Sequence, residues 1–322
     1  MTNKNVIASL ILAALSSFQV LAIENGTSVD WQNDFDDQVK NNCTGMIVGG
    51  NQVLTAAHCT DLTSITFADG TVMDAVSRDD HPSYLYSSSG SQYDVSVWTL
   101  PQDAKAQNIH YFADLNASNI HVSDSIEIYG FGGDNPLSYA VASIDKLPIN
   151  TTYQYTTSSG LPIQGDSGGM ILKNNKVFAI HVASSHGNLR FGTDLHQTKD
   201  FILEKINGWH YPTVLKGTGT QTIKVQSLHQ NAVVDAAYVA GDVTITGGTC
   251  QTLPTINAFE TCTYELNVTG TGQFHLTTDE VININPTKTP TQPTPNPSHG
   301  SSGGSLNFWG LFALIILILK RK

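Results

Sequence analysis

The chain has 322 residues, 40% of them hydrophobic, so it is long enough to build two domains with sizeable cores. Its formal net charge is −11, and part of its positive charge lies at the two ends, in Lys4 and in residues 320–322. The acidic body excludes nucleic acid as a favoured partner, because binding to phosphate backbones requires clustered basic charge.

Residues 1–22 have the pattern of a secretory signal peptide. Lys4 precedes an apolar run from Val6 to Leu15, and small residues around Ala22 provide a cleavage site. An N-terminal membrane anchor is the alternative, but the apolar run is short for a span. We therefore expect an exported protein whose mature chain begins at Ile23.

Residues 23–210 contain many short β-type runs separated by Gly, Asn, Asp and Ser. Runs at 46–48, 125–129 and 177–180 are examples, and the stretch from Gly45 to Leu54 is predicted as one strand. This spacing predicts an all-β sandwich or barrel. A helix is expected near its end, at about 198–206, where apolar residues recur with helical spacing.

Two sequence blocks within this region carry chemistry. The first reads Leu-Thr-Ala-Ala-His-Cys and ends in His58 and Cys59, and the second reads Gly-Asp-Ser-Gly-Gly over residues 165–169. A serine hydroxyl becomes a good nucleophile when an imidazole takes its proton, and glycines let backbone N–H groups face a developing oxyanion. A third block, between them, starts with His-Pro-Ser-Tyr at residues 81–84 and places Asp94 directly ahead of an apolar run.

These three blocks, in this order, resemble the trypsin/chymotrypsin-like serine endopeptidases. The resemblance implies two six-stranded antiparallel β-barrels with a C-terminal helix over residues 23–210. It implies hydrolysis of peptide bonds in protein or peptide substrates, without a cofactor. By the same resemblance Ser167 is the nucleophile, His58 the general base, and Asp94 the residue that orients His58. The N–H groups of Gly165 and Ser167 are expected to form the oxyanion hole.

Two other classes of function remain open at this point. The pattern Gly-x-Ser-x-Gly also occurs in esterase-like hydrolases, but the α/β periodicity of that fold is missing here. An inert protease fold that serves as a surface binding protein is the second alternative, because fold and function can separate.

The resemblance also implies an activation ion pair. In the resembling family, a new N-terminus that begins Ile-x-x-Gly folds inward onto the Asp before the nucleophile. Residues 23–26 read Ile-Glu-Asn-Gly, so Ile23 is expected to pair with Asp166 once the signal peptide is removed. The alternative is that Ile23 merely begins a strand.

The four cysteines are expected to form two disulfides. The resemblance pairs Cys43 with Cys59, and Cys250 and Cys262 are close enough in sequence for a local bridge. An even number of cysteines behind a signal peptide fits an oxidising compartment. No metal site is predicted, since neither Cys-x-x-Cys nor His-x-x-x-His spacing occurs.

Three residues are expected to line the substrate pocket. Leu161 stands where trypsins that cleave after Arg or Lys carry an Asp. His181 matches a histidine that the glutamyl-endopeptidase branch uses to bind a substrate carboxylate, and Ser184 can add a hydroxyl donor. The pocket therefore predicts an acidic or otherwise non-basic residue before the scissile bond. Apolar or small side chains remain an alternative, and a basic one would require a carboxylate from another loop.

Residues 211–286 are predicted to form a separate small β-sandwich of the immunoglobulin-like kind. Runs at 222–225, 243–245 and 262–268 alternate with period two. Nothing in this region has the pattern of a catalytic site. It is interpreted as an accessory domain for substrate or surface attachment, with a passive spacer as the alternative.

The C-terminal residues predict a linker and a tail. Residues 287–305 are rich in Pro, Thr, Ser and Gly and read as an extended linker. An apolar run at 306–319 and a basic end at 320–322 follow a Gly-Gly pair, which together resemble the GlyGly-CTERM sorting tail of Gram-negative bacteria. The resemblance implies transient membrane anchoring through residues 306–319, processing by the export and sorting machinery, and a secreted or cell-surface destination. An ordinary C-terminal anchor is the alternative.

Overall fold

A computed structural model describes residues 23–87, 90–118, 120–133, 135–149, 151–185 and 187–286. The expected signal peptide, the linker at 287–305 and the tail at 306–322 lie outside these residues. Among the helices of the described part, none is long and apolar enough to cross a membrane. Residues 23–286 fall within one compact unit.

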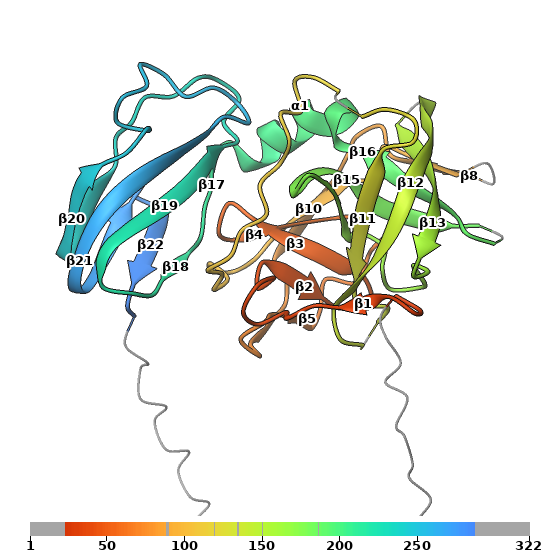
Figure 1. The fold of residues 1–322 in the computed structure, drawn as a ribbon, viewed down its shortest axis with the longest axis horizontal. Helices are drawn as coiled ribbons and strands as arrows, with labels where there is room; N and C mark the ends of the chain where they lie inside the picture. The colour runs from red at the N-terminus through yellow and green to blue at the C-terminus, as the bar shows by residue number, and fades with distance from the viewer. Residues whose placement is uncertain are drawn as a thin grey trace, which may run out of the picture. The chain divides into compact units, whose positions relative to one another are not determined.

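The first sheet has the strand order β6-β5-β2-β3-β4-β10-β7 (Figure 1). Its strands are β2 (Gln38–Lys40), β3 (Thr44–Val48), β4 (Gln52–Thr55), β5 (Ile65–Thr66), β6 (Val72–Met73), β7 (Ser77–Asp80) and β10 (Ser96–Thr99). The end strands β6 and β7 do not pair with each other in the described residues, so this half of the fold is a half-barrel rather than a closed barrel. A separate hairpin joins β8 (Leu85–Ser87) to β9 (Gly90–Gln92).

The stretch from Gly45 to Leu54 is a hairpin, and the prediction of one continuous strand is wrong. The turn between β3 and β4 contains Gly49 and Gly50, whose φ angles are +59° and +82°. Glycine adopts this left-handed conformation without steric cost, which allows the chain to reverse direction.

The second sheet closes into a six-stranded barrel. Its order is β1-β12-β11-β14-β15-β16-β13, and a further pairing of β12 with β13 completes the ring. The strands are β1 (Thr27–Ser28), β11 (Ser125–Gly130), β12 (Ser138–Ile149), β13 (Thr152–Ser159), β14 (Met170–Lys173), β15 (Lys176–Ser184) and β16 (Leu189–Asp194). Together with the half-barrel this confirms the expected chymotrypsin-like fold class.

The helix α1 (Leu195–Ile206) follows β16 and begins three residues before the expected start. Asp194 caps it, because its carboxylate accepts a hydrogen bond from the His196 N–H at 3.0 Å. The helix ends where Asn207 adopts a left-handed conformation.

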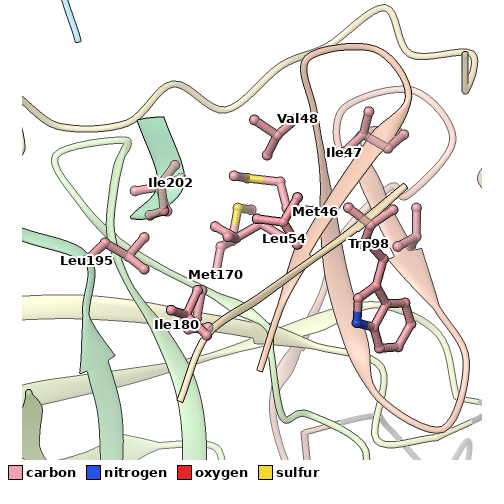
Figure 2. Packing of buried hydrophobic residues seen from close by; sticks show 14 of the residues in the cluster. Met46, Ile47, Val48, Leu54, Trp98, Met170, Ile180, Leu195 and Ile202 are labelled. Carbon is pink, nitrogen blue, oxygen red and sulfur yellow. The ribbon is translucent and has the colours of Figure 1, made fainter. Parts of the chain in front are cut away.

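One hydrophobic cluster joins the two sheets and α1 (Figure 2). Met46 and Leu54 enter it from the first sheet, and Met170 and Ile180 from the second. Ile202 contributes from the helix. All five side chains are at most 1% exposed. Burial of this kind fixes the two halves of the fold against each other.

The C-terminal residues form a third sheet, of order β17-β19-β21-β22-β18, with β20 paired to β21. Its strands are β17 (Trp209–His210), β18 (Val214–Leu215), β19 (Gly219–Ser227), β20 (Tyr238–Gly247), β21 (Thr261–His275) and β22 (Val281–Ile284). The sheet has its own apolar cluster, and its runs at 222–225, 243–245 and 262–268 lie in strands as predicted.

The third sheet is hydrogen-bonded to the segment 104–116, which leads from the first sheet to the second. The buried side chain of Gln226 accepts from the Phe112 N–H and donates to the Phe112 and Phe259 carbonyls, at 2.8–2.9 Å. The Thr213 hydroxyl donates to the Ala104 carbonyl at 2.6 Å. This region is therefore built into the protease body through specific polar contacts.

Both predicted disulfides are present. Cys43 is bonded to Cys59, and Cys250 is bonded to Cys262. The first bridge connects β3 to the turn that follows β4, where the histidine block lies.

Candidate active site

The pairing of β4 with β10 places Asp94 beside His58. Ser96 is the register partner of Thr55, so the residues just outside these two strands meet at the same end of the sheet. The Asp94 carboxylate accepts from the His58 backbone N–H at 2.9 Å, and its other oxygen lies 2.8 Å from the imidazole Nδ1. Asp94 is fully buried, whereas the His58 side chain is 28% exposed. This geometry fixes the orientation of the His58 ring. It leaves the second ring nitrogen, Nε2, available for proton transfer.

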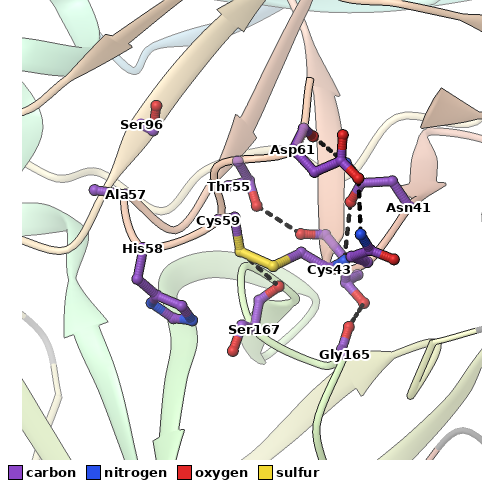
Figure 3. Close-up of a disulfide and its surroundings, with 12 residues drawn as sticks. Asn41, Cys43, Thr55, Ala57, His58, Cys59, Asp61, Ser96, Gly165 and Ser167 are labelled. Atoms are coloured by element: carbon purple, nitrogen blue, oxygen red, sulfur yellow. Dashed lines mark hydrogen bonds between the residues drawn. A yellow bond between two sulfur atoms is a disulfide. The ribbon is translucent and has the colours of Figure 1, made fainter. Parts of the chain in front are cut away.

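Ser167 comes from the second sheet and reaches the same place. It lies in the loop before β14, and its carbonyl accepts the Thr44 N–H of β3 at 2.8 Å. Figure 3 shows its hydroxyl pointing toward the side of His58, whereas its backbone carbonyl faces the Cys43–Cys59 bridge. The hydroxyl and the ring make no hydrogen bond in the described structure. Such contacts often tighten only when substrate is bound.

Two backbone N–H groups beside Ser167 have no acceptor. The amides of Gly165 and Ser167 donate to no group of the described residues. Gly165 has a φ of +100°, and a Cβ there would lie 2.1 Å from the Gly133 nitrogen. A glycine is therefore required at this position, and it leaves its N–H free for a ligand.

Asp166 is buried and does not contact the Ile23 nitrogen in this chain. Its carboxylate accepts the N–H groups of Gly132 and Ile163 at 2.7 and 2.6 Å. The Ile23 nitrogen, which is an amide because Ala22 precedes it, donates to the Ser138 hydroxyl at 3.0 Å. Burial raises the pKa of Asp166 to about 7, although the two N–H donors and the charge of Arg190 act in the opposite direction.

The three predicted pocket residues are tied by hydrogen bonds to the segments on either side of Ser167. The Ser184 hydroxyl donates to the Pro162 carbonyl at 3.1 Å, which places it next to Leu161. The His181 carbonyl accepts the Gly168 N–H at 2.7 Å. His181 is only 1% exposed, and its Nδ1 lies 2.6 Å from the Tyr155 hydroxyl. Burial, and then the charges of Arg190 and His58, lower the pKa of His181 to about 3, so its ring is neutral.

Sequence reasoning missed two neighbours of the predicted pocket residues, Tyr155 and Arg190. Tyr155 on β13 and Ser184 on β15 are both register partners of Arg190 on β16. The available signal in the sequence was a single arginine in a strand that carries no other charge before Asp194. This signal does not identify the neighbours of Arg190, because they depend on pairing between distant segments.

A metal site is not supported by the donors at this place. Cys43, His58 and Cys59 offer ligand atoms within 4.8 Å of one another. Both sulfurs are joined in the disulfide, however, and thiolate is the form that binds metals.

The family model described as Trypsin matches residues 23–202 of the chain. The chain belongs to the trypsin family of serine endopeptidases. A trypsin from Saccharopolyspora erythraea is 28% identical over 169 residues, which are 43% of this chain and 73% of that protein.

Solved structures of trypsin-family proteases are similar in fold. The VesB protease of Vibrio cholerae has 20% identity and a TM-score of 0.47, over 81% of this chain and 98% of VesB. The secreted serine protease VesC of the same organism has 15% identity and a TM-score of 0.48, over 80% and 70%. Neuropsin from mouse brain has 20% identity and a TM-score of 0.49, over 56% and 98%.

Proposed function

We propose that this trypsin-family protein is an exported endopeptidase that works through Ser167, His58 and Asp94. The observation that carries the proposal is the buried Asp94 carboxylate, which holds both the backbone N–H and the Nδ1 side of His58. With its Nδ1 proton bound to Asp94, the ring presents an unprotonated Nε2 that can take the Ser167 proton.

In this mechanism Ser167 attacks the scissile carbonyl of a protein or peptide substrate. His58 receives the hydroxyl proton and then donates it to the leaving amine, which yields an acyl-enzyme that water hydrolyses. The free N–H groups of Gly165 and Ser167 bind the oxyanion of the tetrahedral intermediate. After cleavage before Ile23, the new amine is expected to replace the Ser138 contact and to pair with Asp166.

Leu161 argues for a non-basic residue before the scissile bond. A buried arginine or lysine side chain of the substrate would need a carboxylate partner, and leucine offers none. The neutral, buried state of His181 makes it a weak anion receptor by itself, so its proposed contact with a substrate carboxylate needs help from a second group.

The third sheet and the chain ends complete the proposal. Residues 209–286 make polar contacts with the segment 104–116. These contacts support a role of the third sheet in stabilising the protease body, in addition to the roles of attachment domain or spacer. Secretion is proposed from the signal-like residues 1–22, and VesC, a similar fold, is itself described as secreted. Release from a Gram-negative cell surface would follow removal of the tail at 306–322. Sequencing both ends of the exported protein by mass spectrometry tests these assignments.

The function is tested with a fluorophosphonate probe and a peptide-library digest of the purified, naturally processed protein. We expect labelling of Ser167 and peptide cleavage, and a loss of turnover of about 10⁶-fold in Ser167→Ala. Absence of both labelling and cleavage in a folded protein would favour the inert binding protein instead.

A further inference from the structure

Arg190 is a buried cation that forms no ion pair with the described residues. Its side chain is 5% exposed, and no carboxylate of the described residues lies within ion-pair distance of it. Burial of an unpaired charge is costly, so a protein rarely retains one without a ligand or a counter-ion. The free-energy cost of burying this guanidinium indicates that it has a functional role at its position.

The hydrogen bonds of Arg190 leave one edge of the guanidinium without a partner among the described residues. Nη1 donates to the carbonyls of Ser185, Gly187 and Leu189, at 2.8–3.4 Å. Nε is buried and has no partner, and Nη2 makes no hydrogen bond in the described part of the chain. The Nε and Nη2 groups form the edge that binds both oxygens of a carboxylate in parallel.

Strand pairing places Arg190 beside residues that the sequence predicts to line the substrate pocket. β16 lies between β13 and β15, so Arg190 is directly opposite both Tyr155 and Ser184 (Figure 1). His181 is paired with Gly192, two residues further along β16 and therefore on the same face. The charge of Arg190 acts on Tyr155, on His181 and on Asp166, the residue before Ser167.

We propose that Arg190 is the specificity-determining residue of the pocket and binds the side-chain carboxylate of a substrate Glu or Asp before the scissile bond. The inference rests on the proposed peptidase function and gives it a substrate class. Nη1 holds the guanidinium in place through the loop carbonyls, which leaves Nη2 and the Nε beside it as the unpartnered donors for a substrate carboxylate. The Tyr155 hydroxyl is bonded to the His181 ring, and the Ser184 hydroxyl is bonded to the Pro162 carbonyl, so these neighbours of Arg190 are held in place.

The test compares peptide substrates that differ only in Glu or Gln, or Asp or Asn, before the scissile bond. We expect kcat/KM to favour Glu over Gln by about 100-fold in the natural protein, since the amide cannot pair with the guanidinium. In Arg190→Gln this ratio should fall to below about 5, whereas Arg190→Lys should retain part of it. Using the ratio within each variant cancels any general loss of activity.

Lys105→Gln is the matched control, because it removes one positive charge at an exposed position. Its Glu/Gln ratio should equal that of the natural protein. An unchanged ratio in Arg190→Gln would overturn the proposal. So would a gain of cleavage after all residues alike, which would identify Arg190 as a plug of the pocket.

Failure of the proposed function is recognised separately. Fluorophosphonate labelling of Ser167 does not depend on the residue before the scissile bond. A labelled enzyme that cleaves best after apolar or basic residues contradicts the Arg190 assignment alone. An unlabelled, inactive protein contradicts the peptidase proposal on which the assignment rests.

Discussion

Asp166 is the residue that we propose gains an ionic partner, the new amine of Ile23, when the chain is cut before Ile23. In the uncut chain its carboxylate has two N–H donors and no ionic partner, and burial raises its pKa to about 7. The native state then holds a proton that the unfolded state, with a pKa near 3.8, has already released. Stability therefore falls as pH rises between these two values.

Replacing Asp166 by Asn should lessen this pH dependence. We compare uncut Ser167→Ala protein with and without the added Asp166→Asn change. Between pH 5 and pH 7.5, the protein that retains Asp166 should lose stability to urea relative to the Asp166→Asn protein. Asp194, whose pKa is raised to about 6 chiefly by burial, leaves a residual slope. Urea midpoints at several pH values measure the effect, and equal slopes with and without Asp166 would contradict it.

A second prediction at the residue scale concerns Asp94. In Asp94→Asn the amide can donate to His58 Nδ1, which stabilises the tautomer that carries its proton on Nε2. That ring cannot accept the Ser167 proton, so kcat should fall by about 10⁴-fold, as for other Ser-His-Asp triads. Steady-state kinetics measure the loss, and an unchanged circular dichroism spectrum checks the fold. A loss smaller than tenfold would argue against the role of Asp94.

At the scale of elements, the third sheet holds the connection between the two halves of the protease. The Gln226 side chain pairs with the N–H and C=O of Phe112 as a neighbouring strand would. The contact fixes a segment that has little regular structure of its own. We infer that the protease body and the third sheet unfold together.

Gln226→Leu should therefore destabilise the whole protein by about 2–4 kcal/mol, because it leaves buried backbone groups of Phe112 without partners. Gln221→Leu on the same strand is the control, since Gln221 bonds only to the nearby Thr218 carbonyl at an exposed site. Thermal unfolding monitored by calorimetry gives both values. Separate transitions for the protease body and the third sheet would contradict joint unfolding.

Motifs within single segments were readable from the sequence, whereas contacts between segments were not. His58 and Ser167 each lie in a short sequence motif that is specific for one kind of chemistry. Short alternating runs predicted the positions of most strands. Arg190 gave no such signal, because its role depends on the register of β16 with two other strands. The Gln226 contact joins residues 114 positions apart, so no local pattern could predict it.

At the scale of the whole molecule, the net charge of −11 acts on approaching substrates. An acidic body repels acidic peptides over distances that salt shortens. For peptides that differ only in flanking charges, kcat/KM should rise a few-fold with salt for acidic flanks and fall for basic ones. Measurements between 0.01 and 0.3 M NaCl check this prediction, and parallel salt responses of the two peptides would refute it.

Because the site is divided between two sheets, it can be assembled only after both sheets have been synthesised. His58 and Asp94 emerge from the ribosome well before Ser167, and β13, β15 and β16 must all be present before the second barrel closes. The Gln226 contact comes later still. A chain therefore cannot assemble the complete site until most of it has been translated.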